Sequence, residues 1–300
     1  MATVRAAVET RTVIEAPGSQ VGSGAPSGRV LVLLDGSRMS YAALEEAARI
    51  AAATDADVLG LFVEELNLLR SAGFGFAREV GSASGVSRPF NQGDLEQRIQ
   101  RLAGQARQAL AEAVGRYGGR HTLSISRGSV VEEVLALAGS QDLLVLGRVG
   151  WSSAPGGRLG STARGLLRRS PGRVLLWCER PVSPGGRVVV FLNDHDEANH
   201  RAIMAAAQAA RHSRRPVTVL SGSDASMSPE RLEQIRQGLG VAGSEVRVRL
   251  LPSADPVTIA QILRQEGAAQ LVVSRESSLL RQPGAEQLLT VLNLPVTVTP

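Results

Sequence analysis

The chain has 300 residues, 43% of them hydrophobic and only 3% aromatic, which suits one large or two medium domains with cores of Leu, Val and Ala. Its 33 basic residues are all arginine and give a formal net charge of +5, but their scattered placement argues against a nucleic-acid partner. A single cysteine excludes a disulfide framework, and no apolar run approaches the ~20 residues that span a bilayer, so a soluble, cytoplasmic protein without a membrane partner is expected.

The first half of the chain is predicted to alternate buried strands with amphipathic helices. Residues 1–28 end in a Gly-, Pro- and Ser-rich stretch, and we expect them to form a flexible tail. The apolar runs that follow are typical of strands buried on both faces. The expected strands are residues 29–34, 57–63, 121–127, 143–146 and 173–177, and the expected helices are residues 40–53, 94–117, 130–138 and 162–169. This order predicts a doubly wound, parallel, five-stranded sheet over residues 29–180.

A long segment, residues 64–93, separates the second strand of this half from its second helix. It is predicted to be irregular, with Phe74, Phe76 and Phe90 set among Gly and Ser. A loop of this length in a compact domain is usually functional or mobile. We therefore expect it to change shape with a ligand or to dock a protein partner.

The pattern of the first half begins again after a Pro- and Gly-rich joint at residues 181–186. The segment Gly186-Arg-Val-Val-Val-Phe-Leu192 matches Gly28-Arg-Val-Leu-Val-Leu-Leu34, and an Ala-rich helix follows each of them. The further elements expected are strands at residues 216–220, 245–251, 269–273 and 295–299, and helices at residues 197–211, 230–239, 258–266 and 286–292. The sequence therefore predicts two tandem five-stranded α/β domains, residues 29–180 and 186–300, packed as a pseudo-dimer with their last strands near the interface.

A glycine-rich segment follows the expected strand at residues 143–146. Gly147, two spacers, Gly150, nine spacers and the pair Gly160-Ser161 lead into a helical pattern. Glycines let the backbone approach a ligand closely, and a helix N-terminus offers unpaired N–H groups and partial positive charge. Arg148 and Arg158 can add formal charge at the same rim. This segment therefore predicts a place for phosphates.

That spacing resembles the nucleotide-binding signature of the universal stress protein family, and the stretch Val-Leu-Leu-Asp-Gly-Ser at residues 32–37 strengthens the resemblance. The resemblance implies an adenine-nucleotide-binding α/β fold of the hydrolase-like class, and a cofactor that is ATP, with or without Mg²⁺, or a related adenine nucleotide. It places Asp35, followed by Gly36, beside the ribose and base, and the main chain of Val63 against the adenine. It also places Gly147, Arg148 and Gly150 near the ribose and α-phosphate, and Gly160 and Ser161 at the β- and γ-phosphates.

The second copy lacks this glycine loop. Ser274 and Ser277 stand where Gly147 and Gly150 stand in the first copy. The segment that follows, residues 279–286, is several residues shorter and has no Gly-Ser pair. We expect the second copy to keep the fold without a nucleotide.

Each of these site assignments has a plainer alternative. Asp-Gly-Ser at the end of a strand is good turn and helix-cap chemistry that needs no ligand. The glycines could form a tight strand-to-helix turn and a surface loop. No catalytic residue is assigned, because Asp35, Ser161 and the arginines supply only fragments of a phosphoryl-transfer site. No metal ligand is assigned either, since the four histidines do not cluster with Cys or paired carboxylates.

These observations favour a cytoplasmic stress-response regulator that binds ATP or a related adenine nucleotide in its first domain. Two alternatives stay open: a nucleotide-free interaction or scaffold module that docks a partner through residues 64–93, and a slow ATP-hydrolysing enzyme. The choice among ATP, AMP and a cyclic nucleotide also stays open, as does formation of a homodimer.

Overall fold

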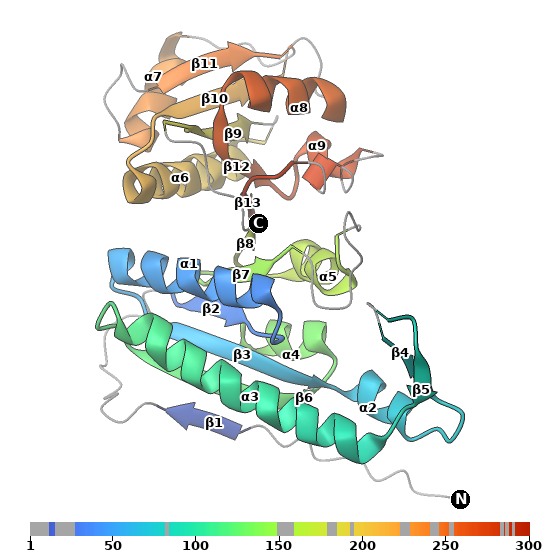
Figure 1. Ribbon diagram of the computed structural model, residues 1–300. Helices are drawn as coiled ribbons and strands as arrows, with labels where there is room; N and C mark the ends of the chain where they lie inside the picture. The colour runs from blue at the N-terminus through green and yellow to red at the C-terminus, as the bar shows by residue number, and fades with distance from the viewer. Residues whose placement is uncertain are drawn as a thin grey trace, which may run out of the picture.

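The computed structural model describes residues 12–15, 28–81, 84–148, 159–178, 185–192, 195–222, 229–240, 246–251, 255–282, 285, 288–289 and 292–300. One sheet of eleven strands runs through the molecule in the order β1-β6-β3-β2-β7-β8-β13-β12-β9-β10-β11, with helices on both of its faces (Figure 1). Its strands are β1 (Thr12–Glu15), β2 (Val30–Leu33), β3 (Val58–Glu65), β6 (His121–Gly128), β7 (Leu143–Gly147), β8 (Arg173–Trp177), β9 (Arg187–Leu192), β10 (Val217–Ser221), β11 (Val246–Leu250), β12 (Ala268–Ser274) and β13 (Val296–Thr299).

The first half of the sheet is parallel from β6 through β3, β2 and β7 to β8, and β1 joins its edge antiparallel to β6. The side chains of each strand alternate between two layers. Val30 and Val32 share a core with the helices α1 (Arg38–Thr54) and α3 (Gln92–Gly115). Leu31 shares a core with α4 (Val130–Leu137) and α5 (Ser161–Arg169). These strands are buried on both faces, which explains why their sequences read as continuous apolar runs.

The second half repeats the strand order of the first. The strands β11, β10, β9, β12 and β13 are parallel to one another. Their helices are α6 (Asp196–Ser213), α7 (Pro229–Leu239), α8 (Pro256–Gln265) and α9 (Ser278–Arg281). Counted along the chain, both halves place their five parallel strands in the order third, second, first, fourth, fifth. The α/β class and the mostly parallel sheet are therefore confirmed.

The two halves meet at the strand pair β8·β13, which is antiparallel with Leu176 opposite Val296 and Val174 opposite Val298. On one face of the sheet a single core crosses this junction, because Val174 and Leu176 cluster with Phe191 and Val296 of the second half. On the other face the cores under α1 and under α6 remain separate clusters. The halves are thus joined by main-chain pairing and by a shared apolar layer.

Two segments differ from the sequence expectations. Residues 12–15 of the expected tail form β1, whereas the rest of that segment up to residue 27 lies outside the described residues. The expectation that residues 64–93 are irregular is wrong, because β3 continues to Glu65 and is followed by α2 (Leu66–Ala72) and a hairpin of β4 (Arg78–Val80) and β5 (Ser87–Pro89). Leu69 and Ala72 anchor α2 in the core, so tertiary burial holds a helix that has no side-chain cap.

Candidate functional site

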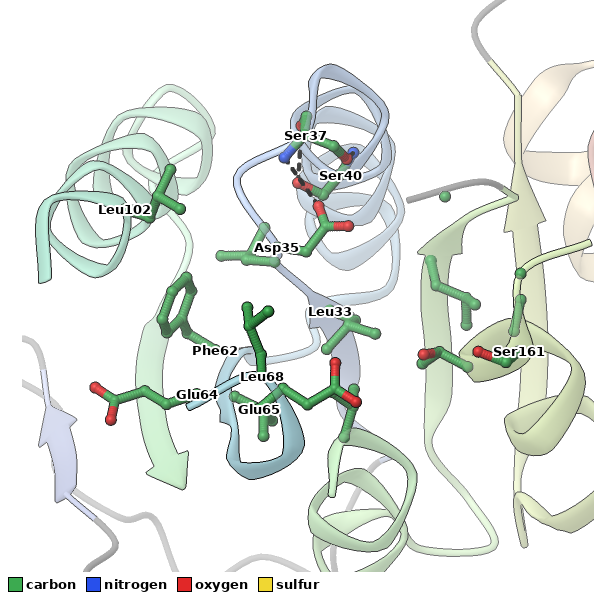
Figure 2. Close-up of a pocket in the computed structure, with 18 of the residues that line it drawn as sticks. Leu33, Asp35, Ser37, Ser40, Phe62, Glu64, Glu65, Leu68, Leu102 and Ser161 are labelled. Carbon is green, nitrogen blue, oxygen red and sulfur yellow. Dashed lines mark hydrogen bonds between the residues drawn. The ribbon is translucent and has the colours of Figure 1, made fainter. Parts of the chain in front are cut away.

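A cavity of about 430 Å³ opens at the carboxyl ends of β2, β3 and β7 (Figure 2). These are the first, second and fourth parallel strands of the first half, so the cavity lies where the chain reverses its direction across the sheet. Open α/β sheets bind ligands at such a switch point. The residues that line it are Leu33, Leu34, Asp35, Ser37, Ser40, Phe62, Val63, Glu64, Glu65, Leu68, Ile99, Leu102, Val130, Leu146, Gly147, Arg148, Leu159, Gly160, Ser161, Thr162 and Ala163.

One side of the cavity is apolar. Phe62 on β3, Leu68 on α2 and Leu102 on α3 gather on this side, opposite Ser161 (Figure 2). Phe62 is buried, and Leu68 and Leu102 are half-buried against the same core. A flat, largely apolar ring of a ligand would find its hydrophobic contacts here.

Asp35 sits at the rim in a turn that the chain itself stabilises. Its Oδ1 accepts a hydrogen bond of 2.9 Å from the Ser37 main-chain N–H, and Ser37 Oγ accepts one of 3.1 Å from Ser40 N–H to cap α1. Gly36 does not line the cavity. Its φ of +78° and the Leu102 side chain, 2.6 Å from where a Cβ would stand, explain why this position needs glycine.

The opposite side of the cavity is formed by the N-terminus of α5. Gly160 is the N-cap residue and provides no side-chain cap, so the N–H groups of the first turn have no such acceptor. Among the described residues, a Cβ added at Gly160 would meet nothing closer than the Arg148 carbonyl oxygen at 4.0 Å, so none of them crowds this helix end. Ser161 and Thr162 line the cavity beside it. This end of the cavity is suited to an anion.

Gly147 closes the cavity floor at the end of β7. A Cβ there would lie 3.0 Å from Met39 Cβ and 3.3 Å from its carbonyl carbon, so glycine lets α1 approach the strand closely. Gly150 and Arg158 lie outside the described residues. The structure thus brings Asp35, Val63, Gly147, Arg148, Gly160 and Ser161 to one cavity.

Arg148 lines the cavity, yet its guanidinium is engaged elsewhere. It is buried, and its Nη2 donates a 2.8 Å hydrogen bond to the Leu294 carbonyl oxygen of the second half. Its main-chain N–H donates to the Trp177 carbonyl oxygen at 3.2 Å. Burial lowers the pKa of the Arg148 guanidinium. The first contact ties the end of β7 to the segment before β13, and the second ties it to the end of β8.

Two acidic residues that the sequence reasoning missed also line the cavity. Glu64 Oε2 pairs with Arg127 Nη2 of β6 at 2.7 Å, and Glu65 is the last residue of β3. Carboxylates accept hydrogen bonds from hydroxyl or amino groups and repel phosphates. Figure 2 shows the Glu64 carboxylate pointing away from Ser161 and the Glu65 carboxylate on the Ser161 side of Phe62. Their position directly after Val63, at the end of the expected strand, was the available signal.

Neither a metal site nor a membrane span is found within the described ranges. No group of three or more His, Cys, Asp or Glu side chains in them could hold a metal ion. Likewise, none of the helices in the part of the chain that the structure describes is both long and apolar enough to cross a bilayer.

Comparison with known proteins identifies the family. The model of the "Universal stress protein family" matches residues 26–177, about half of the chain and the part that contains the whole cavity. The chain belongs to the universal stress protein family. No curated protein matches the chain.

Solved universal stress proteins share the fold of this family member. A universal stress protein from Archaeoglobus fulgidus DSM 4304 is 16% identical, with a TM-score of 0.65, and the match covers 91% of this chain and 96% of that one. A putative universal stress protein from Pseudomonas aeruginosa UCBPP-PA14 is 18% identical, with a TM-score of 0.54 and coverage of 90% and 92%. A shorter universal stress protein from Archaeoglobus fulgidus was solved in complex with dAMP; it is 19% identical, with a TM-score of 0.30 and coverage of 38% and 98%.

Proposed function

We propose that the first half of the chain binds ATP or a related adenine nucleotide in the cavity at the carboxyl ends of β2, β3 and β7. In this proposal the chain is a cytoplasmic stress-response regulator. The observation that carries the proposal is the pairing, within one cavity of about 430 Å³, of an apolar side with an uncapped helix N-terminus. A nucleotide has the matching combination of an apolar base and charged phosphates, and the volume lies within the range of small-molecule sites.

The polar and apolar residues that line the cavity determine the orientation of the nucleotide in it. The base would lie against Phe62, Leu68 and Leu102, with the main chain of Val63 available to hydrogen-bond its edge. Ribose hydroxyls would donate to Asp35 or Glu65, since both carry acceptor oxygens at the cavity wall. The phosphates would then point to the other side, toward α5.

The residues at α5 would hold the phosphates. Gly160 leaves the N–H groups of the first turn accessible, and Ser161 adds a hydroxyl next to them. Gly147 keeps the floor of the cavity free of a side chain. A bound Mg²⁺ would supply charge that offsets the repulsion among the phosphate oxygens. Arg148 would stabilise the junction of the two halves and would not hold the phosphates, because its guanidinium is bonded to the Leu294 carbonyl oxygen.

We propose further that the second half is a nucleotide-free copy of the same domain. At the end of β12, Ser274 Oγ accepts a 3.1 Å hydrogen bond from Glu276 N–H. Ser277 Oγ accepts one of 3.2 Å from Leu279 N–H, and both serines are buried. The turn that corresponds to the phosphate end of the first half therefore satisfies its own donors. Its role would be to support the first half through the β8·β13 junction.

The test is thermal unfolding with and without Mg-ATP, on the wild type and on Gly160→Val/Ser161→Ala. A ligand at ~100-fold its dissociation constant stabilises by ~2.7 kcal/mol. For a domain of this size the melting temperature would rise by about 5–10 °C. The double variant should lose this shift, and Arg107→Gln, an exposed change on α3, should keep it. AMP and cyclic AMP in parallel distinguish the nucleotides. No shift in the wild type with any of them would refute the proposal.

One observation favours a second candidate, a protein-interaction module. Phe74 and Phe76, between α2 and β4, are 55% and 82% exposed, and their rings stack with centroids 5.4 Å apart. Exposed aromatic pairs of this kind mark contact surfaces more often than random surface does. If the wild type binds no nucleotide, this surface becomes the leading functional feature.

The alternative of a slow ATP-hydrolysing enzyme would require ATP turnover that Asp35→Ala abolishes.

A further inference from the structure

A second cavity, of about 880 Å³, lies between the two halves of the chain. It is bounded by the end of α1, the residues before β7, the start of β8 and one side of α6, which lies above α1 in Figure 1. Arg173 begins β8, so this cavity opens at the amino ends of the first-half strands, opposite the nucleotide cavity. We call it the junction cleft and define it by its six basic side chains: Arg173, His200, Arg201, Arg211, His212 and Arg214.

The junction cleft gathers more positive than negative charge. Among the described residues no Asp or Glu side chain lines it, and the α-carboxylate of Pro300, the last residue of the sequence, brings one negative charge to it. Arg201 has partial neutralisation, because its Nη1 lies 3.8 Å from Glu197 and its Nε donates to a main-chain oxygen of Pro300. The other five basic residues form no ion pair within the described part of the chain. Like charges around one low-dielectric wall repel one another, and an anion in the cleft relieves that repulsion.

Arg173 is the most telling of these residues. Its guanidinium donates to Gln208 Oε1 of α6, a neutral acceptor, rather than to a carboxylate. Burial lowers its pKa, since the charged form loses hydration that no counter-charge replaces. A half-buried guanidinium at a cavity wall, held by a neutral amide, retains donors and full charge for a ligand.

His212 of α6 also lines the cleft. Its Nε2 is buried and forms no hydrogen bond within the described part of the chain. Burial lowers the pKa of His212, Arg49 lowers it further and Glu46 raises it. An anion in the cleft would favour the protonated form of the His212 ring through its charge.

We propose that the junction cleft binds a small phosphate-bearing anion that bridges the two halves. Arg173 reaches it from the first half, and Arg211, His212 and Arg214 reach it from the second. Planar guanidinium groups form paired hydrogen bonds with phosphate oxygens, and several of them converge on the cleft. Because the bound anion contacts both halves, it stabilises their association at the β8·β13 strand pair. This site is separate from the nucleotide cavity, and the inference does not depend on the proposed function.

The test is calorimetric titration of the full chain with inorganic pyrophosphate at 0.15 M salt, where attraction between exposed charges is screened beyond about 8 Å. The wild type should bind it saturably. The exposed pair Arg211→Gln/Arg214→Gln should weaken binding at least about tenfold, as expected when about 1.4 kcal/mol of interaction is lost. Arg107→Gln removes an equally exposed charge from α3 and should bind like the wild type.

Two further variants make the result specific to the junction cleft. Gly160→Val/Ser161→Ala should retain pyrophosphate binding, whereas loss there would mean that the anion occupies the nucleotide cavity and would overturn the proposal. Arg173→Gln should weaken binding, and Arg173→Lys should restore only part of it, since lysine keeps the charge and loses the paired donors. Absence of saturable binding to the wild type, or equal weakening by Arg107→Gln, would also overturn it. Circular dichroism and melting curves check that each variant is folded.

Discussion

Arg148 and Arg275 reach across the β8·β13 junction in opposite directions. Arg148, directly after β7, donates from Nη2 to the Leu294 carbonyl oxygen at 2.8 Å. Arg275, directly after β12, donates from Nη2 to the Ser170 carbonyl oxygen at 2.6 Å. Each acceptor lies just before the last strand of the other half. The two bonds therefore form a reciprocal pair that follows the repeated strand order of the two halves.

This reciprocity predicts that the two arginines stabilise the junction in the same way. Arg148→Met and Arg275→Met should each lower the free energy of unfolding by about 1.5–3 kcal/mol, the usual contribution of a hydrogen bond from a charged group. Urea unfolding followed by circular dichroism measures the loss, with Arg107→Met as the exposed control. A loss in only one of the two variants would contradict the reciprocal arrangement.

The same pair separates a stabilising role of Arg148 from a ligand-binding role. Because its guanidinium is bonded to Leu294, nucleotide affinity should remain within about twofold of wild type in Arg148→Met, well below the tenfold change that 1.4 kcal/mol produces. Arg275→Met, far from the cavity in the sequence and in the other half, is the matched control. If nucleotide affinity falls in Arg148→Met alone, Arg148 contacts the phosphates after all.

Two glycines of the cavity should respond differently to one added methyl group. Gly147→Ala places its Cβ 3.0 Å from Met39 Cβ and should destabilise the fold by about 1–3 kcal/mol through overpacking. The added Cβ of Gly160→Ala meets no described residue closer than 4.0 Å, so its cost is that of a poorer N-cap, about 1 kcal/mol or less. The methyl at Gly160 should instead weaken nucleotide binding. Melting temperatures and titrations on both variants separate the two effects, and the reverse ranking of stability would contradict this account.

The stacked pair Phe74 and Phe76 should contribute little to stability. Phe76 is 82% exposed, and substitutions at such positions usually change the free energy of unfolding by less than about 0.5 kcal/mol. Phe76→Ser should therefore melt like the wild type, whereas Phe62→Ser, inside the core, should unfold several degrees lower. A large loss in Phe76→Ser would mean that the ring packs against the body of the protein, and it would remove the argument for an interaction surface.

The parts of the fold that depend on local sequence patterns could be predicted from the sequence. Runs such as Leu143–Leu146 are buried on both faces of the sheet, and burial on both faces leaves a continuous apolar signature. Asp35 and Gly160 were assigned to one site through the resemblance to the universal stress protein family, and the strand order agrees with it because parallel strands bring their carboxyl ends to the same edge. Periodicity was sufficient for the strands, and the resemblance was needed for the site.

Features that depend on distant contacts left no such signal. The strand β1 has four residues and is defined by pairing with β6, which no local period encodes. The side chain of Arg148 bonds to Leu294 because of the way the two halves meet. The sequence shows only that Arg148 follows Gly147 in the glycine-rich segment. The position of Glu64 directly after Val63 could have placed it at the cavity, but its pairing with Arg127 follows from the register of β3 and β6.

Asp142 should give the stability of the first half an acid-sensitive component. Burial opposes its ionisation, but hydrogen bonds from the Arg29 side chain and from the main-chain N–H groups of Gly139 and Arg29 outweigh that effect, so its pKa is lowered. A lowered pKa means that the stabilisation is complete above the unfolded value of about 3.9 and is lost as pH falls through the folded value.

Asp142→Asn keeps the size of this side chain and removes its charge. At pH 7 the free energy of unfolding of the variant should be about 1.5–3 kcal/mol lower than that of the wild type, because charged hydrogen bonds become neutral ones or are lost. The gap between the two proteins should stay constant from pH 7 to pH 5 and narrow below about pH 4, as wild-type Asp142 is protonated. Urea unfolding at pH 7, 5 and 3.5 measures it. A gap that widens toward low pH would show that the carboxyl is destabilised by its burial and that the Arg29 contacts do not compensate.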